Sequence, residues 1–498
     1  MSLEVGRAAP PVDVRRSLFT YLSSIVGTYL FLALSFGTSI YLTRRLGADG
    51  FGRLTLAFTV VQTATIFAAF WSHAGFLRYG AEELVTHGNL HRVFWGRALA
   101  ITPAIVVVVA LGGLFRERIA EFHGVPAVGF SALIIYLVAL LAGQTLQVVY
   151  QARGRAGLWS FLQAGERALI LAFLLSTTTE PARVIFIYIA AAAVLALGGL
   201  AFSDRHDFIP VETSRDSVRR LVAFSWPILI GVFASYLTSN WLDVAIIRHY
   251  LNTAAVGQYA LAYQLMGAIQ QIPMLSFPVI VPLLVGASVE QRHGSLGLYL
   301  DRVVPHAIFL MVALLFAGVV LGPPLVPLLF GPAFVESARA LPVLLLAVGF
   351  YSMFIAYIPI LNLRERTGAM LAASVAAAAA NLAGDLLLIP VWGILGAAWA
   401  TVASQCAGAS VVAWLAWREH RFSFGPAISF LAPLLIAVVG WTFFDGWYAA
   451  LSATAAAILL ALAGRVHRLC SASDQRFLAS LGIPVLHKWL PVPAGERS

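Results

Sequence analysis

The stretch TRRLGADGFGRLTLA, residues 43–57, lies between two long apolar runs and carries three arginines. A related stretch, RHYLNTAAVGQYALA, follows at residues 248–262, where Leu251 repeats Leu46. Two further stretches repeat at a similar spacing, QARGRAGLWS (151–160) and NLRERTGAML (362–371). The chain is therefore interpreted as a tandem repeat with a period of about two hundred residues.

The bulk composition indicates whether this chain lies in water or in a lipid bilayer. Apolar residues make up 60% of the 498 residues, charged residues only 11%, and the mean hydropathy is +0.86. Soluble domains carry roughly 25% charged residues, so one soluble core cannot enclose this much apolar surface. The composition predicts an integral membrane protein.

Apolar windows of about twenty residues, long enough to cross a bilayer as helices, follow one another along the chain. Their approximate bounds are 18–42, 52–77, 94–115, 126–150, 157–178, 183–202, 222–247, 256–286, 299–321, 338–362, 368–390, 393–416, 424–443 and 446–464. The first window exceeds a signal-peptide core and has no small-residue cleavage site after it, so it is expected to stay attached. No window alternates as a barrel strand does. We predict an all-α integral membrane fold with about 14 transmembrane helices.

The loop charges predict the orientation. With the windows crossing alternately, 23 Lys and Arg residues fall on the side of the N-terminus and 8 on the other side. Excess positive charge marks the cytoplasm, so both termini are expected inside. The stretch at 43–57 then forms an external turn.

The repeat predicts the domain organisation. Six helices per repeat is an even number, so both halves insert with the same topology as two pseudo-symmetric six-helix bundles. Parallel repeats place a substrate site between the halves and support alternating access. The predicted parts are an N-terminal bundle (1–202), a cytoplasmic linker (203–221), a C-terminal bundle (222–420), two additional transmembrane helices (421–466) and a cytoplasmic tail (467–498).

Several motifs in order carry a family resemblance. They are LTRRLGADGFGRLTLA (42–57), LRYGAEE (77–83), LDVAIIRHYLNTAAVGQYALAYQL (242–265), LFGPAFVESARALPVL (329–344) and NLAGDLLLIPVWGILGAAWATVAS (381–404). Together they resemble the polysaccharide transporter family, the Wzx-like O-antigen and exopolysaccharide flippases of the multidrug/oligosaccharidyl-lipid/polysaccharide exporter superfamily. The resemblance covers residues 15 to about 420. One departure is the turn after the seventh window, where His249 to Asn252 replace the Leu-Gly of many relatives.

The resemblance implies a function, a location and partners. Family members are thought to move undecaprenyl-pyrophosphate-linked oligosaccharides from the cytoplasmic to the outer leaflet of the bacterial inner membrane. The expected partners are this glycan, the lipid bilayer and the polysaccharide polymerase and chain-length machinery, with no nucleic acid. No cofactor is expected beyond coupling to Na⁺ or H⁺.

Catalytic motifs are missing from the sequence. Lys488 is the one lysine and stands between His487 and Trp489, so the chain contains no Walker A motif. It also lacks His-Glu-x-x-His and Asp-x-Asp motifs, and we predict that it is not an enzyme. Two alternatives stay open: a cation-coupled multidrug exporter of the same superfamily, and a membrane polysaccharide polymerase, against which the short external loops argue.

Acidic residues within the apolar windows are candidates for ion coupling. They are Glu166, Asp243 and Asp385. An intramembrane carboxylate is costly, so it is expected to be protonated, to hold a cation or to be paired inside the bundle. Structural alternatives remain, namely a pairing of Asp243 with Arg248, a local hydrogen bond at Asp385, and a later start of the fifth window that leaves Glu166 in the cytoplasm.

Arginines are candidates for binding the pyrophosphate, because guanidinium groups grip phosphate oxygens bidentately. Arg78 is the first choice for lining the cavity, and Arg45 and Arg248 form a pseudo-symmetric outer pair. The remaining candidates are Arg44 at the outer mouth, Arg16 and Arg220 at the cytoplasmic mouth, and Arg167 in the fifth window. The alternative for Arg16 and Arg220 is ordinary positive-inside anchoring, and for the outer turn it is anchoring to lipid phosphates.

Overall fold

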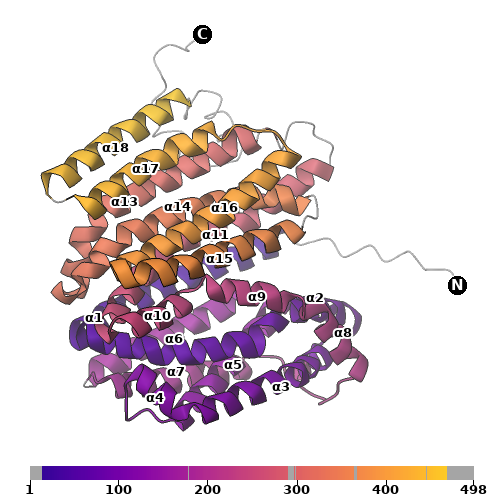
Figure 1. Cartoon of the computed structure of the whole chain (residues 1–498). Coiled ribbons are helices and arrows are strands. Elements are labelled where there is room, and N and C mark those ends of the chain that lie inside the picture. The colour runs from indigo at the N-terminus through magenta and orange to yellow at the C-terminus, as the bar shows by residue number, and fades with distance from the viewer. Residues whose placement is uncertain are drawn as a thin grey trace. The chain divides into compact units, whose positions relative to one another are not determined.

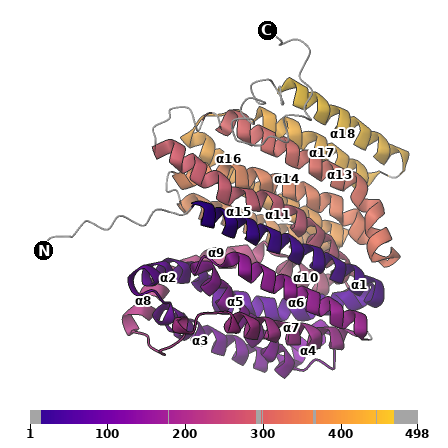
Figure 2. The same ribbon diagram turned by 180° about the vertical axis from the view of Figure 1, so that it is seen from behind.

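The computed structural model describes residues 14–177, 179–289, 297, 299–363, 367–444 and 446–467 (Figures 1 and 2). Every regular element in these ranges is a helix, and none of them contains a strand. Helices satisfy their backbone hydrogen bonds within one segment, which the interior of a bilayer demands. The predicted all-α class is confirmed.

The described residues form two compact units, one ending at Tyr236 and one beginning at Leu237. The first unit contains α1 (Val14–Ala69), η1 (Phe70–Ser72), α2 (His73–His87), α3 (His91–Leu114), α4 (Arg116–His123), α5 (Phe130–Ala152), α6 (Ala156–Ser176), α7 (Pro181–Ala201), η2 (Arg205–Asp207), α8 (Arg215–Ser225) and α9 (Ile228–Leu237). The finer division at residues 202, 221, 420 and 466 stays a prediction.

The second unit contains α10 (Asn240–Tyr250), α11 (Thr253–Val289), η3 (Tyr299–Val303), α13 (Val304–Phe330), η4 (Pro332–Phe334), α14 (Val335–Leu363), α15 (Thr367–Trp392), α16 (Ile394–Glu419), α17 (Gly425–Phe443) and α18 (Trp447–Val466). The last two helices lie side by side in both views (Figures 1 and 2). They are the two helices that the sequence predicts beyond the repeat.

Gly47 interrupts α1 within the stretch that opens the sequence analysis. Its φ of 66° and ψ of −174° are non-helical, and they divide the 56-residue α1 into two helical arms. A side chain rarely adopts a positive φ, whereas glycine adopts it freely. The turn predicted at residues 43–57 is therefore present. The first predicted window lies in the first arm of α1, and the second begins in the second arm and continues through η1 into α2.

Membrane-length apolar helices are abundant in the described residues. Eleven helical segments are long and apolar enough to cross a membrane, or twelve if the bent pair α8 and α9 forms one span. One of the eleven, Leu22–His87, is 66 residues long and contains the Gly47 break. The protein is a multi-pass membrane protein, and the full count of fourteen crossings stays a prediction.

The predicted window 222–247 is broken rather than continuous. The axes of α8 and α9 meet at 47° around Trp226 and Pro227, and α9 ends at Leu237 before α10 begins at Asn240. Proline lacks the backbone donor of a helix interior, which explains the first break. The second break coincides with the border between the two compact units.

Small residues allow α15 and α16 to pack closely in the second unit. A Cβ added to Gly384 would lie 2.8 Å from the Cβ of Ala400, so only glycine fits there. Contacts between small residues let transmembrane helices approach at backbone distance. This packing brings the polar residues of α15 next to α16.

Candidate functional site

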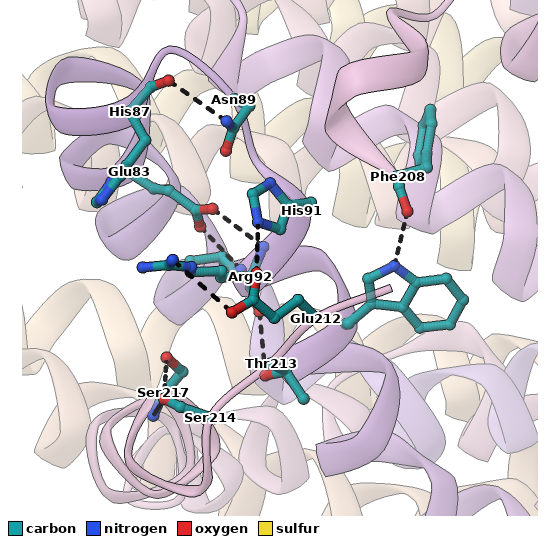
Figure 3. Close-up of polar contacts among 12 residues, drawn as sticks. Glu83, His87, Asn89, His91, Arg92, Phe208, Glu212, Thr213, Ser214 and Ser217 are labelled. Atoms are coloured by element: carbon teal, nitrogen blue, oxygen red, sulfur yellow. Dashed lines mark hydrogen bonds and ion pairs between the residues drawn. The ribbon is translucent and has the colours of Figure 1, made fainter. Parts of the chain in front are cut away.

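Glu83 fixes the start of α3 against the end of α2. Its buried carboxylate accepts hydrogen bonds from the backbone amides of Arg92 at 3.0 Å and Val93 at 2.8 Å, as Figure 3 shows. These amides belong to the first turn of α3 and have no partner within their own helix. A carboxylate at this end also interacts favourably with the helix dipole. Glu83 therefore caps a helix that it does not belong to.

The segment before α8 is attached to the same turn of α3 (Figure 3). The indole Nε1 of Trp95 donates to the carbonyl oxygen of Phe208 at 2.8 Å. The carboxylate of Glu212 lies 3.8 Å from His91 and 3.9 Å from Arg92. These contacts fix the position of α8 within the first unit.

A second attachment joins this segment to the end of α5. Arg153 donates from Nε to Asp207 at 2.8 Å and also from Nη2, and Asp207 is 1% exposed. The hydrogen bond to Asp207 raises the pKa of Arg153 above its ordinary value, so the guanidinium stays charged. The predicted linker is thus an ordered part of the first unit from η2 onward.

Arg78 and Arg220 meet on one aromatic ring. The Arg78 Cζ lies 5.9 Å from the ring centre of Tyr79 and 4.7 Å from that of Phe224, and the Arg220 Cζ lies 5.0 Å from the Tyr79 ring. An ion pair at 3.4 Å joins Arg220 to Glu82. Both arginines are exposed. We call Arg78, Tyr79 and Arg220 the mouth cluster.

A cavity of about 150 Å³ lies beside the mouth cluster, between α2, α3 and α8. Its polar lining includes Tyr79, Glu82, Thr86, Arg92 and Arg220. Arginines stacked on aromatic rings and open to solvent are suited to binding phosphate. The cavity therefore presents the donors of Arg92 and Arg220 beside the carboxylates of Glu82 and Glu83, and Arg78 lies outside its lining.

Arg167 lies in the middle of α6, with Glu166 beside it. Since α6 begins at Ala156, both residues are well inside a helix of 21 residues. The alternative, a membrane span that starts later and leaves both residues in the cytoplasm, stays open. The Arg167 Cζ lies 5.1 Å from the ring centre of Phe31 and 5.2 Å from that of Tyr188, so cation–π contacts hold the guanidinium against α1 and α7.

The arginines predicted at the outer mouth flank the Gly47 turn. Arg44 and Arg45 are exposed, and the Arg45 Cζ lies 5.6 Å from the ring centre of Tyr41. Arg53 bonds Asp49 at 3.0 Å and the carbonyl oxygen of Gly124 at 3.2 Å, so it fastens the turn.

Two predicted arginines lie elsewhere. Arg248 is half-buried in the last turn of α10, in the second unit. The backbone of Arg16 belongs to the first turns of α1, and its side chain lies outside the described residues.

The two predicted acids of the second unit come together. Asp243 of α10 is 1% exposed and Asp385 of α15 is fully buried. The Nδ2 of Asn381 donates to both carboxylates, at 2.9 Å to each. The hydroxyl of Tyr259 donates to Asp243 at 2.5 Å and lies 3.2 Å from the Thr401 hydroxyl. We call these five residues the acid cluster.

The chemistry of the acid cluster follows from its composition. Every donor to the carboxylates named above is neutral, and no described arginine forms an ion pair with them. Two buried carboxylates that share one amide nitrogen repel each other when both are ionised. The cluster is therefore suited to taking up a proton or a small cation.

Sequence reasoning missed Tyr259, Thr401 and Arg97. Tyr259 stands inside the quoted repeat motif, where its polar hydroxyl was a usable signal. Arg97, which is fully buried in α3, lies inside a predicted apolar window and was also readable as an intramembrane charge.

Comparison with known proteins assigns the family. A family model described as "Polysaccharide biosynthesis protein" matches residues 15–287, more than half of the chain. The chain belongs to this family. The "Probable flippase AglR" of Haloferax volcanii is 23% identical over 388 residues, which cover 74% of this polysaccharide biosynthesis protein and 77% of that relative. The "Probable low-salt glycan biosynthesis flippase Agl15" of the same organism is 23% identical over 396 residues, 78% of this chain and 80% of the relative.

A solved structure shares the fold of this polysaccharide biosynthesis protein. The lipid II flippase MurJ, in its inward closed conformation, aligns with a TM-score of 0.68 at 11% identity and covers 93% of this chain and 99% of its own. These comparisons confirm the predicted resemblance to polysaccharide transporters. The family match and the two Haloferax volcanii relatives, both named as flippases, also confirm that the chain belongs among transporters and not among enzymes.

Proposed function

We propose that this polysaccharide biosynthesis protein is a flippase that moves a polyprenyl-pyrophosphate-linked oligosaccharide across the membrane by alternating access of its two halves. The family and the names of its relatives support the transport of a glycan carrier. The finer proposal is that the cargo is an O-antigen or exopolysaccharide repeat unit, moved across a bacterial inner membrane with both termini of the protein in the cytoplasm.

The observation that carries the proposal is the position of Arg167. Its guanidinium lies halfway along a membrane-length helix, between aromatic rings. Arginine cannot lose its charge in a protein, and a charge at this depth is costly without an anion or water to solvate it. A pyrophosphate that enters the membrane needs such a group, because its own transfer into hydrocarbon is equally costly.

The other predicted arginines define the proposed route. The mouth cluster, with Arg78 and Arg220, would receive the pyrophosphate at the cytoplasmic side together with Arg16. Arg44, Arg45 and Arg248 would release it at the outer side. The support for the first step is that the structure brings Arg78 and Arg220 to one ring.

The acid cluster is the proposed site of energy coupling. We propose that Asp243 and Asp385 exchange a proton or a sodium ion during the cycle, with Glu166 as a second candidate in the first unit. A gradient supplies ~2.3 kcal/mol per unit charge for each 100 mV. The expected partners of the flippase are the polymerase and the chain-length machinery that consume its product.

The test is translocation of a defined lipid-linked glycan in proteoliposomes, together with complementation of a flippase-deficient strain. We expect Arg167→Ala and Arg78→Ala each to reduce translocation at least tenfold at equal membrane levels, with partial rescue by lysine. Arg118→Ala, at an exposed arginine of α4, is the control that keeps full activity.

Other outcomes would point to other functions. If Arg167→Ala and Arg78→Ala translocate normally, the cationic route is wrong. Transport of lipophilic cations, with no movement of the glycan, would instead identify a multidrug exporter. Lengthening of the glycan chain would identify a polymerase.

A further inference from the structure

A break divides the second predicted window of the first unit. The helix α1 ends at Ala69, η1 follows, and α2 starts at His73. The amide of His73 bonds the carbonyl of Phe70, as in a 3-10 turn, so the carbonyl of Ala69 loses the donor that a continuous helix would supply. The hydroxyl of Ser72 replaces it by donating to the Ala69 oxygen at 2.6 Å.

Arg97 holds this serine in place. The guanidinium is fully buried, its Nε donates to Ser72 Oγ at 2.9 Å, and its Nη1 donates to Thr145 Oγ1 at 2.7 Å. Thr145 in turn donates to the carbonyl of Leu141 at 2.7 Å. One side chain of α3 therefore links the break to α5 by continuous hydrogen bonds.

The surroundings of Arg97 make the burial of its guanidinium costly in free energy. Among the described residues, its hydrogen-bond partners are two neutral hydroxyls, and no carboxylate forms an ion pair with it. The Cζ lies 5.9 Å from the ring centre of Phe76, and Nη2 has no described acceptor. A buried charge without a counter-ion opposes folding, because the cost of removing it from water is not offset by an opposite charge. Stability therefore does not account for Arg97.

The position of the break suggests what Arg97 does. The helix α2 starts directly after Ser72 and carries Arg78 and Tyr79 less than two turns later. A helix is stiff over this length, so the geometry of the break sets where these two residues lie. The ring contacts of the mouth cluster depend on that placement.

We propose that Arg97 is a positioning residue for substrate recognition: it holds the break between α1 and α2 and thereby places Arg78 where the phosphate group of the lipid-linked substrate binds. This inference rests on the proposed function. Arg97 itself is enclosed and touches no substrate. Its effect on recognition passes through Ser72 and the direction of α2.

The first experiment measures the break without any transport. Spin labels are attached at Gln62→Cys in α1 and Val85→Cys in α2, in a chain with Cys406→Ala and Cys470→Ala, and their distance is measured by double electron–electron resonance. Val85 is 88% exposed and accepts a label. We expect Arg97→Gln to add a second distance population. Ser72→Ala, which keeps the charge, should add the same population, and Thr102→Ala, an exposed hydroxyl of α3, should add none.

The second experiment measures translocation against substrate concentration. We expect Arg97→Gln to raise the half-saturating concentration of the lipid-linked glycan about tenfold and to leave the maximal rate per folded molecule within a factor of two. Arg97→Lys should raise the half-saturating concentration less than Arg97→Gln does. The double variant Arg97→Gln with Arg78→Ala should have a half-saturating concentration no higher than that of Arg78→Ala alone, because both changes remove the same contact.

The outcomes separate the possible failures. An unchanged distance distribution in both Arg97→Gln and Ser72→Ala overturns the proposal. So does a changed distribution with an unchanged half-saturating concentration, which would leave Arg97 a purely structural residue. If the parent chain moves no lipid-linked glycan, the proposed function fails and substrate positioning fails with it, while the distances still decide whether Arg97 holds the break.

Discussion

Asn381 donates to two carboxylates from one nitrogen, and this geometry makes it the centre of the acid cluster. The residue itself carries no charge. Its contribution is to hold Asp243 and Asp385 at a fixed separation in a dry environment, where repulsion between the carboxylates is strong. In the proposed coupling mechanism, the affinity of the pair for a positive charge therefore depends on a neutral side chain.

Replacing this residue tests the cluster directly. We expect Asn381→Leu to destabilise the protein by about 3 kcal/mol, because both buried carboxylates lose a donor. The measurement is the thermal unfolding midpoint in detergent, with and without sodium at several pH values. Ser404→Ala is the control, since this buried hydroxyl on α16 has no described hydrogen-bond partner. Equal midpoints for the two variants would contradict the assigned role.

The sequence predicts the members of this cluster better than their connections. Asn381 and Asp385 are four residues apart and share a helix face, so their contact follows from helical geometry. Asp243 is 138 residues away from Asn381, and only the packing of α10 against α15 brings the two together. Neither the composition nor the repeat shows which residues meet when they are far apart in the sequence, and for this reason the sequence analysis missed Tyr259 and Thr401.

At the scale of elements, short segments fix the long helices of the first unit. The N-terminus of α3 receives its cap from α2, and α8 is attached to the same turn of α3 by the segment before it. Window counting predicts the long helices, because twenty apolar residues are a strong signal. It joined α8, α9 and α10 into one window, since a break within an apolar run leaves the hydropathy unchanged.

Two neighbouring glutamates allow a matched test of the cap. We expect Glu83→Ala to destabilise the first unit by about 1–2 kcal/mol and to speed hydrogen exchange at the amides of residues 92 and 93, which lose their acceptor. Glu82→Ala should have little effect, because Glu82 is 54% exposed in its side chain and forms only a surface ion pair. Similar exchange in both variants would show that the α3 cap contributes nothing.

His123 makes the end of α4 sensitive to acid. Burial lowers the pKa of His123 below its ordinary value of 6.5, and its Nδ1 accepts a hydrogen bond from the amide of Val125 at 3.1 Å. The folded pKa is the lower one, so the stabilisation is present above pH 6.5 and is lost as the pH falls through the folded pKa. The loss amounts to at most about 1.4 kcal/mol for each pH unit.

This sensitivity is measurable by hydrogen exchange. After correction for intrinsic rates, residues 124–128 should exchange faster at pH 5 than at pH 7.5. His123→Asn keeps an acceptor for Val125 but does not titrate, so the difference should vanish. A difference that persists in this variant would assign the effect to another group.

At the scale of the molecule, the repeat predicts two halves, and the structure contains two compact units. The order and type of the helices agree with the windows because both follow from the length of apolar runs. The border between the units falls within the predicted seventh window and not in the polar linker. The linker is ordered against α3 and α5 by contacts that its polar composition does not reveal.

The orientation of the chain is open to a labelling test. In a chain with Cys406→Ala and Cys470→Ala, we expect Glu117→Cys to react with a membrane-impermeant maleimide in intact cells. His206→Cys should react only after permeabilisation. Both positions are exposed. The opposite pattern would invert the predicted topology and with it the assignment of the inner and outer arginines.

The most deeply buried charge in the membrane-length helices differs in sign between the two units, which bears on how a duplicated gene acquires two tasks. Among the described residues, the first unit encloses Arg97 fully and Glu83 nearly so, whereas the second unit encloses the carboxylates of Asp243 and Asp385. In the proposed cycle, the first copy handles an anion and the second copy handles a cation. We expect a hybrid built from two N-terminal halves to keep Arg167 and Glu166 but to lack the pair of Asp243 and Asp385 that is proposed for ion coupling.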